Sequence, residues 1–493
     1  MRLREKHYIF TPFLCAIYPT ILIYTQNIDD LSETAGQLLF PVLIVSLFAA
    51  FVWMVVNCFV KDTKLSALIV SPSIVMLLLY GIVFEFVSAL LAKSNIRILI
   101  LVCLTFFLVL LYCIFYYAVL RFRQSRKIIL LHKIIIFVTV LMIGFNFAQI
   151  FSHEVRRERQ HLSSATDSSS LKPILSNHRP DIYYIILDQY VSLDTIKTIY
   201  NYDNSHFANN LRKMGFYIAT KSKTEFVNTK TSLAAALNMS AEIVNNKTRY
   251  LADHHASVTS DLGFTTREDS YYKKLIRENA VVKFLKCNGY KYIHFGPRWY
   301  GTRYNKNADR NFYCSGFRFS NELANLIVES SIIRLVLSNR IPIFHGGHRE
   351  GVLYAFDELA KIPKIKHPKF VFAHILCPHA PFVFGVNGES VKFKDSSNWI
   401  NKSIYLGQYI FITKKIEKLV DEIISHSESP PIIVIQSDHG ITVEGYNDSS
   451  KSIFNAYYLP YGGNEVLWPS IQPVDTFRVI FDYYFYNTIQ KKG

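Results

Sequence analysis

Residues 432–440 read Ile-Ile-Val-Ile-Gln-Ser-Asp-His-Gly, an apolar run that passes directly into an acid, a histidine and a glycine. The four β-branched residues favour a buried strand, and the polar residues follow where that strand ends. Adjacent Asp438 and His439 can face one ion only if the backbone bends there, which Gly440 permits. Carboxylate oxygen together with imidazole nitrogen suits zinc or manganese. This stretch therefore predicts a metal-binding strand end.

Three further apolar runs have the length and composition of buried strands, and helix-like stretches separate them. The strands are expected at Ile182–Leu187, Lys291–Phe295 and Phe370–Leu376, and the helices near 230–239, 271–287, 319–338 and 402–426. This alternation predicts an α/β sandwich with a mostly parallel central sheet over residues 180–493. In such sheets, ligands bind beyond the carboxyl ends of the strands.

Two of these strands also lead into residues that can take part in catalysis. Asp188 follows Leu187, and a carboxylate at the tip of a buried strand is costly to desolvate unless it pairs or binds a metal. A helix cap or a surface turn is the alternative for an isolated acid. His379 lies in Cys377-Pro-His-Ala-Pro381, where two prolines constrain the loop. The alternative interpretation of His379 is a structural histidine that is held by hydrogen bonds. The same structural role is expected for His374 on the preceding strand.

The segment Asn228-Thr-Lys-Thr-Ser-Leu-Ala234 places several hydroxyl groups at the start of a helix-forming stretch. Backbone N–H groups at a helix start favour an anion, and a hydroxyl there can attack phosphorus. Simple N-capping by Thr229 or Thr231 is the alternative, and for this segment alone it is the better explanation. The joint occurrence of two acids, a hydroxyl and two histidines along one α/β chain favours a shared site.

The first third of the chain has the composition of a membrane domain, because residues 8–152 contain most of the long uncharged runs. A helix needs roughly 20 apolar residues to span a bilayer. Five spans are predicted, at about 8–26, 37–60, 66–92, 98–120 and 128–151. We expect residues 1–152 to form a five-helix transmembrane domain and the Ser-rich, polar residues 153–179 to form a linker.

The charges of the loops predict the orientation of the spans. Basic residues gather at the N-terminus and after the second and fourth spans, whereas the loop after the first span is acidic. The positive-inside rule then places the N-terminus in the cytoplasm, and five spans place everything after residue 152 outside. The formal net charge of +16 fits basic flanks that face anionic lipid. The sequence has no basic stripe interleaved with stacking aromatics, so nucleic acid is not expected as a partner.

The chain has seven cysteines, an odd number without a dense framework. Cys287 and Cys314 lie in the polar half of the chain. A disulfide between them in an oxidising compartment and two unpaired thiols both remain open.

Over about residues 180–470 these motifs resemble the alkaline phosphatase and sulfatase superfamily. The five-span anchor with one outer domain looks like the lipid A phosphoethanolamine transferases and the lipoteichoic acid synthases. The resemblance implies one divalent metal, zinc or manganese, held by Asp188, Thr229, Asp438 and His439. It also implies that Thr229 is the nucleophile, because the family pattern has a serine three residues later, here Ser232. His379 matches the histidine loop that binds the substrate phosphate.

The sequence also departs from patterns within that superfamily. Gln189 stands where many sulfatases have a second Asp. Formylglycine sulfatases need Cys or Ser at the nucleophile position and an Arg shortly after it, where this chain has Thr229 and Leu233, so sulfate-ester cleavage is not expected. Residues 441–452 contain no histidine, although phosphoethanolamine transferases have one there. This departure disfavours a second metal site and ethanolamine phosphate as the transferred group.

The resemblance predicts a metal-dependent phospho-group transferase of the sulfatase-like superfamily. It would move a phospholipid head group, through a phosphothreonine intermediate, onto a cell-envelope glycan or lipid. Two alternatives remain open: a phosphatase or phosphodiesterase with the same site and water as acceptor, and a non-catalytic scaffold for an envelope polysaccharide. The expected location is a bacterial inner membrane, with the C-terminal domain in the periplasm.

Overall fold

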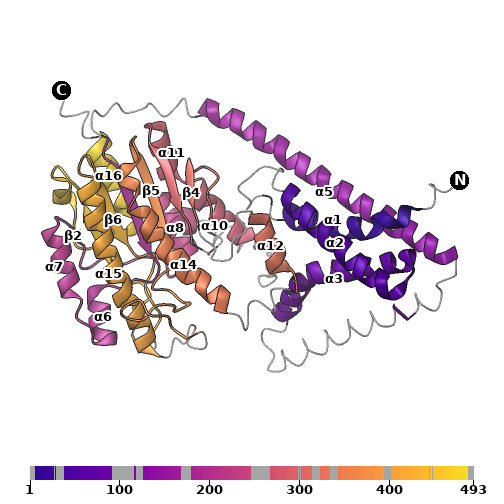
Figure 1. Ribbon diagram of the computed structural model, residues 1–493. Helices are drawn as coiled ribbons and strands as arrows, with labels where there is room; N and C mark the ends of the chain where they lie inside the picture. Colours follow the sequence, from indigo (N-terminus) through magenta and orange to yellow (C-terminus); the bar gives the residue numbers. More distant parts are fainter. Residues whose placement is uncertain are drawn as a thin grey trace. The chain divides into compact units, whose positions relative to one another are not determined.

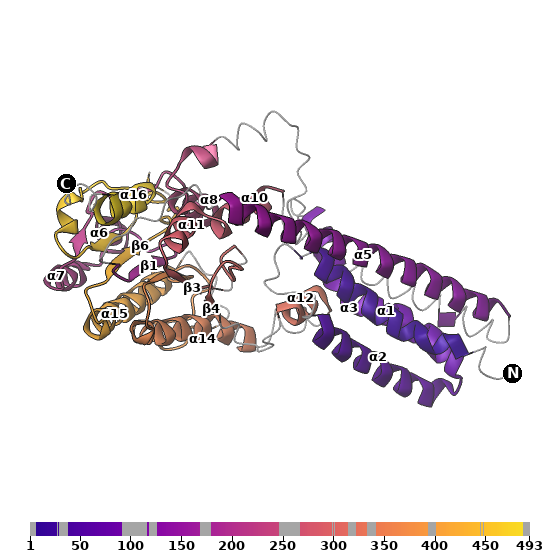
Figure 2. The ribbon, with the colours of Figure 1, turned by 90° about the horizontal axis from the view of Figure 1, so that it is seen from above.

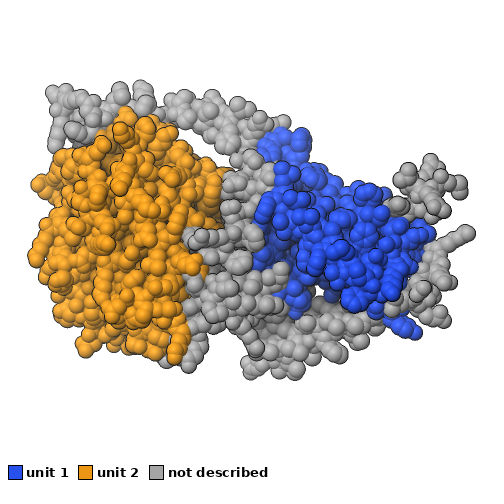
Figure 3. All heavy atoms as spheres, in the orientation of Figure 1, with its two compact units in different colours: residues 1–166, 258–265, 319–341 blue, residues 167–257, 266–318, 342–493 orange. Residues whose placement is uncertain are grey.

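A computed structural model of the chain describes residues 6–26, 28, 38–90, 116–117, 126–167, 179–245, 267–297, 299, 301–313, 322–332, 342–392, 401–443, 445–446 and 448–486. The chain forms two compact units (Figure 3). Unit 1 comprises residues 1–166, 258–265 and 319–341, and unit 2 comprises residues 167–257, 266–318 and 342–493. The predicted span 98–120, apart from residues 116–117, and Cys314 lie outside the described residues. Cys287 is a free thiol.

Unit 1 is helical (Figure 1). Its helices are α1 (Phe10–Gln26), α2 (Leu39–Val60), α3 (Thr63–Leu90), α5 (Arg126–Asp167) and α12 (Glu322–Ser330), and a 3-10 turn, Lys6–Ile9, precedes α1. Among the described residues, three segments are long and apolar enough to cross a membrane: Leu39–Val60, Thr63–Ile82 and Ile128–Val155. The structure thus supports three of the five predicted spans by length and composition, and the full number of five is not confirmed.

The turn between α2 and α3 is encoded by two residues. Lys61 ends α2 in a left-handed conformation with φ of 53°, and its N–H donates to the carbonyl of Asn57. The Asp62 Oδ1 atom then accepts hydrogen bonds from the backbone N–H groups of Lys64 (3.0 Å) and Leu65 (3.2 Å). The carboxylate therefore satisfies two N–H groups that a helix start leaves without intrahelical partners.

Helix α5 is longer than the sequence predicted. We expected a span at 128–151 followed by a linker, but α5 runs from Arg126 to Asp167 and enters the segment 153–179. Its last part contains no proline or glycine, and it carries several Glu, Arg and Gln residues that favour helix. Serine content, which suggested a loop, is only weakly unfavourable to helix.

Unit 2 is built on a seven-stranded mixed sheet with the order β2-β7-β6-β1-β5-β3-β4. β6, β1, β5, β3 and β4 pair with one another in parallel, whereas β7 pairs antiparallel with both β6 and β2. Among the described strands, β7 alone is reversed, which agrees with the prediction of a mostly parallel sheet. The strands are β1 (Ile182–Leu187), β2 (Tyr217–Ile218), β3 (Lys291–Phe295), β4 (Arg310–Phe312), β5 (Lys369–Ile375), β6 (Ile432–Gln436) and β7 (Asn455–Tyr458).

Helices cover both faces of this sheet (Figures 1 and 2). They are α6 (Leu193–Tyr200), α7 (Ser205–Lys213), α8 (Thr229–Leu237), α10 (Arg267–Arg277), α11 (Ala280–Cys287), α14 (Pro342–Leu359), α15 (Lys402–His426) and α16 (Thr476–Phe481). Successive side chains of β1 alternate between two cores: Tyr183, Ile185 and Leu187 join one with α14 and α15, and Ile182, Tyr184 and Ile186 join the other with α8 and α16. Every residue of β1 is buried, as expected for a central parallel strand.

The register of the central strands aligns the points where they end. Leu187 of β1 pairs with Ile375 of β5, and Ile186 pairs with Gln436 of β6. Residues that follow these three strands therefore leave the sheet at one edge. The predicted strands 182–187 and 291–295 and the predicted helix 402–426 are confirmed. The predicted helix 271–287 is in fact two helices, because the Asn279 Oδ1 atom caps α11 by accepting from the Val282 N–H.

Candidate metal centre and active site

The structure brings Asp188, Asp438 and His439 together at the common edge where β1 and β6 end. One ligand atom from each lies within 4.8 Å of the other two, and all three residues are buried. The His439 Nε2 atom is 3.5 Å from Asp438 Oδ2. These side chains come from positions 188 and 438–439, so the topology of the sheet, and not local sequence, creates the cluster.

Two carboxylate oxygens in this cluster fit a cation. Asp188 Oδ1 and Asp438 Oδ2 are buried and have no hydrogen-bond partner among the described residues. Burying a charged oxygen without a partner is costly, which is why such groups are usually paired or bind metals. Two oxygens and one imidazole nitrogen form a donor set that zinc or manganese accepts. The residues present therefore fit a divalent ion.

The acidic pair also shifts the pKa values within the cluster. Burial and the negative charge of Asp188 both raise the pKa of Asp438. For Asp188, burial acts to raise the pKa, but the hydrogen bond with His374 and the nearby histidines outweigh it and the pKa is lowered. Burial acts to lower the pKa of His439, but attraction to Asp438 and Asp188 raises it above its ordinary value. The two carboxylates therefore favour the protonated form of the His439 imidazole.

Thr229 meets this cluster at the first residue of α8. Its Oγ1 atom lies 3.4 Å from Asp188 Oδ2 and 3.4 Å from His439 Nε2. The N-cap is neither Thr229 nor Thr231 but Asn228, whose Oδ1 accepts from the Thr231 N–H at 3.1 Å. Capping is therefore performed by another residue, and the Thr229 hydroxyl lies at a helix start beside two candidate metal ligands. The side chain is partly exposed, which a substrate requires.

Small residues hold the Asp438-His439 turn in place. The Ser232 hydroxyl, one turn into α8, donates to the Asp438 carbonyl at 2.6 Å. The Ser437 hydroxyl donates to the His439 carbonyl at 2.8 Å. A Cβ atom at Gly440 would lie 2.1 Å from the Ser449 carbonyl oxygen, so close backbone approach requires glycine there. His439 Nδ1 lies 2.8 Å from the Gly440 carbonyl, which orients Nε2 toward the acids.

His379 lies in the loop that follows β5, next to the same edge. Its backbone N–H donates to the Asp188 carbonyl at 3.1 Å, and its Nδ1 atom is 2.5 Å from the Ala380 carbonyl. The contact through Asp188 ties this loop directly to the metal cluster.

Gln408 of α15 is a residue of this site that sequence reasoning missed. Its buried Nε2 atom donates to the carbonyls of Pro378 (3.1 Å) and His379 (3.0 Å). Its Oε1 atom accepts from the N–H groups of Val383 (2.7 Å) and Phe384 (3.1 Å). One amide therefore satisfies four backbone groups on both sides of the Ala380-Pro381 turn. A single Gln inside a long amphipathic helix carries no motif that could have revealed this role.

His374 is a buried, hydrogen-bonded histidine, as expected from the sequence, and one of its partners is Asp188. It is buried on β5, with Nε2 3.3 Å from Asp188 Oδ2 and Nδ1 2.6 Å from the Thr302 hydroxyl. The Thr302 carbonyl in turn lies 2.6 Å from His294 Nε2 on β3. Trp299 meets the His374 ring edge-on at 5.8 Å. A chain of buried polar groups, formed by His374, Thr302 and His294, thus orients the Asp188 carboxylate.

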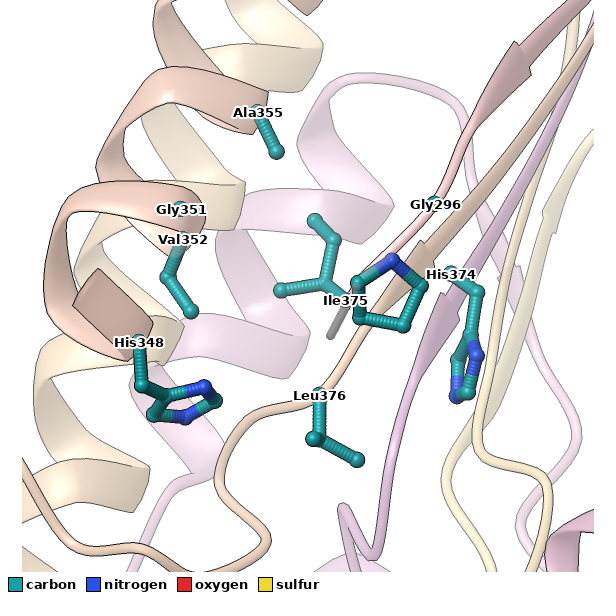
Figure 4. Close-up of a pocket in the computed structure, with 9 residues that line it drawn as sticks. Gly296, His348, Gly351, Val352, Ala355, His374, Ile375 and Leu376 are labelled. Carbon is teal, nitrogen blue, oxygen red and sulfur yellow. The ribbon is translucent and has the colours of Figure 1, made fainter. Parts of the chain in front are cut away.

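A small hollow lies beside His374, where β3 and β5 end next to α14 (Figure 4). His348 and Val352 of α14 line it on one side, and Ile375 and Leu376 line it on the other. Its volume is about 20 Å³, which is room for about one water and too little for a phosphate ester. The hollow therefore borders the site without being its substrate pocket.

Three basic residues of unit 2 lie over aromatic rings, and Gln189 contacts the cluster through its backbone. Lys230 Nζ lies 5.8 Å from the centre of the Tyr272 ring. Arg303 and Arg310 stack on the rings of Tyr313 and Phe312. Gln189 follows Asp188 in a left-handed conformation with φ of 62°, and its N–H donates to Asp438 Oδ1 at 3.2 Å.

No protein-family model and no curated protein matches the sequence. Among solved structures, the zinc complex of the C-terminal periplasmic domain of EptC from Escherichia coli is 11% identical, with a TM-score of 0.41, over 64% of this chain and 86% of that chain. The corresponding domain of phosphoethanolamine transferase EptC from Campylobacter jejuni is 10% identical, with a TM-score of 0.37, over 63% and 92%. A protein of the alkaline phosphatase superfamily from Vibrio parahaemolyticus is 11% identical, with a TM-score of 0.36, over 64% and 68%. These structures are what the chain is similar to, and membership of the alkaline phosphatase superfamily stays a prediction from the sequence motifs.

Proposed function

We propose that this protein is a metal-dependent phospho-group transferase that acts on a phospholipid head group at the outer face of a bacterial inner membrane. One observation carries the proposal: the Thr229 hydroxyl, at a helix start, lies 3.4 Å from both Asp188 Oδ2 and His439 Nε2. These two residues and Asp438 form the cluster of candidate metal ligands. A nucleophile next to metal ligands and helix N–H groups suits attack on a phosphodiester.

The proposed reaction has two displacements at phosphorus. The Thr229 hydroxyl gives up its proton to water, Oγ forms a bond to the phosphorus of the lipid, and the bond from phosphorus to the lipid alcohol breaks. The alcohol leaves with a proton, and a phosphothreonine that carries the head group remains. The hydroxyl of a cell-envelope glycan or lipid then attacks this phosphorus and releases Thr229. A zinc or manganese ion held by Asp188, Asp438 and His439 would lower the pKa of the Thr229 hydroxyl and stabilise phosphoryl charge.

The remaining residues of the site have positioning and binding roles in this proposal. His379, next to Asp188 through its backbone, is assigned to the non-bridging phosphate oxygens and to protonation of the leaving oxygen. The backbone N–H groups at the start of α8 face the same anion. The apolar helices of unit 1 would hold the site near a lipid donor and raise the effective concentration of that donor.

The test is an assay of the full-length chain in membranes with a phospholipid that carries an isotopic label in its head group. Thr229→Ala should reduce transfer of the label about a thousandfold or more, because it removes the nucleophile. Thr229→Ser keeps a hydroxyl and should retain measurable transfer, with a phosphoserine detectable by mass spectrometry at position 229.

Thr231→Ala is the matched control, since Thr231 lies two residues along the same helix and its hydroxyl contacts Asn228. It should leave transfer nearly unchanged. Full activity of Thr229→Ala would refute the assignment of the nucleophile. Release of the label only as a soluble head group would reject transfer in favour of hydrolysis, and no reaction together with bound metal would favour a scaffold.

A further inference from the structure

Helix α12 has an unexpected place in the fold. In sequence it lies between β4 and α14, two elements of unit 2, yet it groups with the helices of unit 1. It packs against α1 and α3, and Figures 1 and 2 both draw it beside these helices. The chain therefore passes from unit 2 to unit 1 and back again well after the first connection between the units.

The contacts of α12 are apolar and well buried. Leu323 and Ile327 lie four residues apart, hence on one face of the helix, and are 0% and 7% exposed. Both belong to the core cluster of unit 1, which includes Ile21, Ile23, Tyr24, Ile74 and Leu78. Just after α12, the Ile332 N–H donates to the Leu77 carbonyl of α3 at 2.9 Å. A packed face and a backbone hydrogen bond together define a specific docking position.

The docking position is defined on two helices of unit 1. Ile21, Ile23 and Tyr24 lie near the C-terminal end of α1, whereas Leu77 lies at the middle of α3. Because α12 contacts both helices, its place within unit 1 is set by more than one surface.

We infer that residues 322–332 are a docking segment, in which a part of the chain that follows β4 packs into the helical core of unit 1. Unit 2 is then attached to unit 1 by this packed helix as well as by the chain between residues 167 and 179. The inference does not depend on the proposed reaction, because it uses only contacts inside unit 1.

The test uses the full-length chain with a protease site inserted after Ser170 and an affinity tag at the N-terminus. After complete cleavage in mild detergent, fragment 171–493 should remain bound to the tagged fragment during purification and gel filtration. Leu323→Asp with Ile327→Asp places two charges in the docked face and should release most of that fragment. Ile332→Asp is the control on the same segment, since this side chain is 37% exposed, and it should leave the fragments together.

A second measurement does not depend on a destabilising variant. Leu77→Cys with Ile332→Cys places thiols at two residues joined by a hydrogen bond, so a short bismaleimide should link the cleaved fragments into one band of full size. The single cysteine variants and the wild type measure the background from native cysteines. Separation of wild-type fragments, retention of the fragment by the double Asp variant, or absence of the cross-link would each overturn the inference.

Discussion

At the scale of single residues, the main feature of the Asp188, Asp438 and His439 cluster is that two carboxylate oxygens lack hydrogen-bond partners among the described residues. The two oxygens are Asp188 Oδ1 and Asp438 Oδ2, both buried, whereas the Asp438 carbonyl accepts from Ser232 and the His439 carbonyl accepts from Ser437. Two adjacent buried carboxylates lower the stability of the fold unless a positive charge compensates them. A divalent ion would supply this charge, and Thr229 lies close enough to reach the same ion.

His439 gives this account a pH dependence. Its pKa is raised because Asp438 and Asp188 stabilise the imidazolium, and a metal can bind Nε2 only after that proton leaves. Below the raised pKa, the apparent metal affinity should fall about tenfold per pH unit, and above it the affinity should level off. The pKa of Asp438 is also raised, so protonation of this carboxylate should further reduce the metal affinity as the pH falls.

Competition with a fluorescent chelator between about pH 5.5 and 8 measures this dependence. His426→Gln, which changes an exposed histidine of α15, should leave the curve unchanged. A wild-type affinity that stays constant across this range would contradict the role of His439 as a ligand.

At the scale of elements, α15 controls the loop that carries His379. Gln408→Ala removes four hydrogen bonds and leaves buried backbone groups without partners, which costs about 2–4 kcal/mol. The thermal midpoint should fall by about 5–10 °C. Turnover should fall more than apparent substrate binding, because the displaced histidine acts mainly on the transition state. Kinetics and thermal unfolding of the full chain in detergent measure both effects.

Two further variants separate positioning from simple packing. Gln408→Met keeps the volume of this buried side chain but loses all four hydrogen bonds, so it should lower turnover as much as Gln408→Ala while recovering the stability that comes from packing. Lys414→Ala, an exposed change on the same helix, should alter neither. If Gln408→Ala lowers stability but not turnover, Gln408 does not position His379.

Strands and helices differ in how well the sequence predicts them. The strands Ile182–Leu187 and Lys291–Phe295 were predicted because short, uninterrupted runs of β-branched and aromatic residues favour a strand over other secondary structures. Helix α14 was missed because Gly346, Gly347 and Gly351 weaken the helical pattern, and tertiary packing overrides that low propensity. The end of α5 was misplaced because its serine-rich part was interpreted as a linker.

The candidate site was predictable only where chemistry sits in a short motif. Ser-Asp-His-Gly and Pro-His-Ala-Pro are short motifs that can be recognised from adjacent residues. Asp438, His439 and His379 could therefore be singled out. Asp188 and Thr229 needed the resemblance to a family. Gln408 and Thr302 could not be found, because their partners lie on elements far away in sequence and only the register of β1, β3 and β5 brings them together.

At the scale of the whole molecule, the chain combines apolar helices in unit 1 with a sheet in unit 2 whose strand ends gather the candidate site. The central claim is that acids and a histidine from separate strands hold one cation. The most direct test is the metal content of the full-length protein, purified after growth with zinc and manganese and measured by inductively coupled plasma mass spectrometry.

We predict about one zinc or manganese ion per chain for the wild type and for the control Asp357→Ala, which changes an exposed acid of α14. Asp188→Ala with Asp438→Ala should lose nearly all of this metal while the apolar core of unit 2 remains intact. A wild-type protein that is saturated with both ions yet binds neither, or a double variant that binds as much metal as the wild type, would contradict the account.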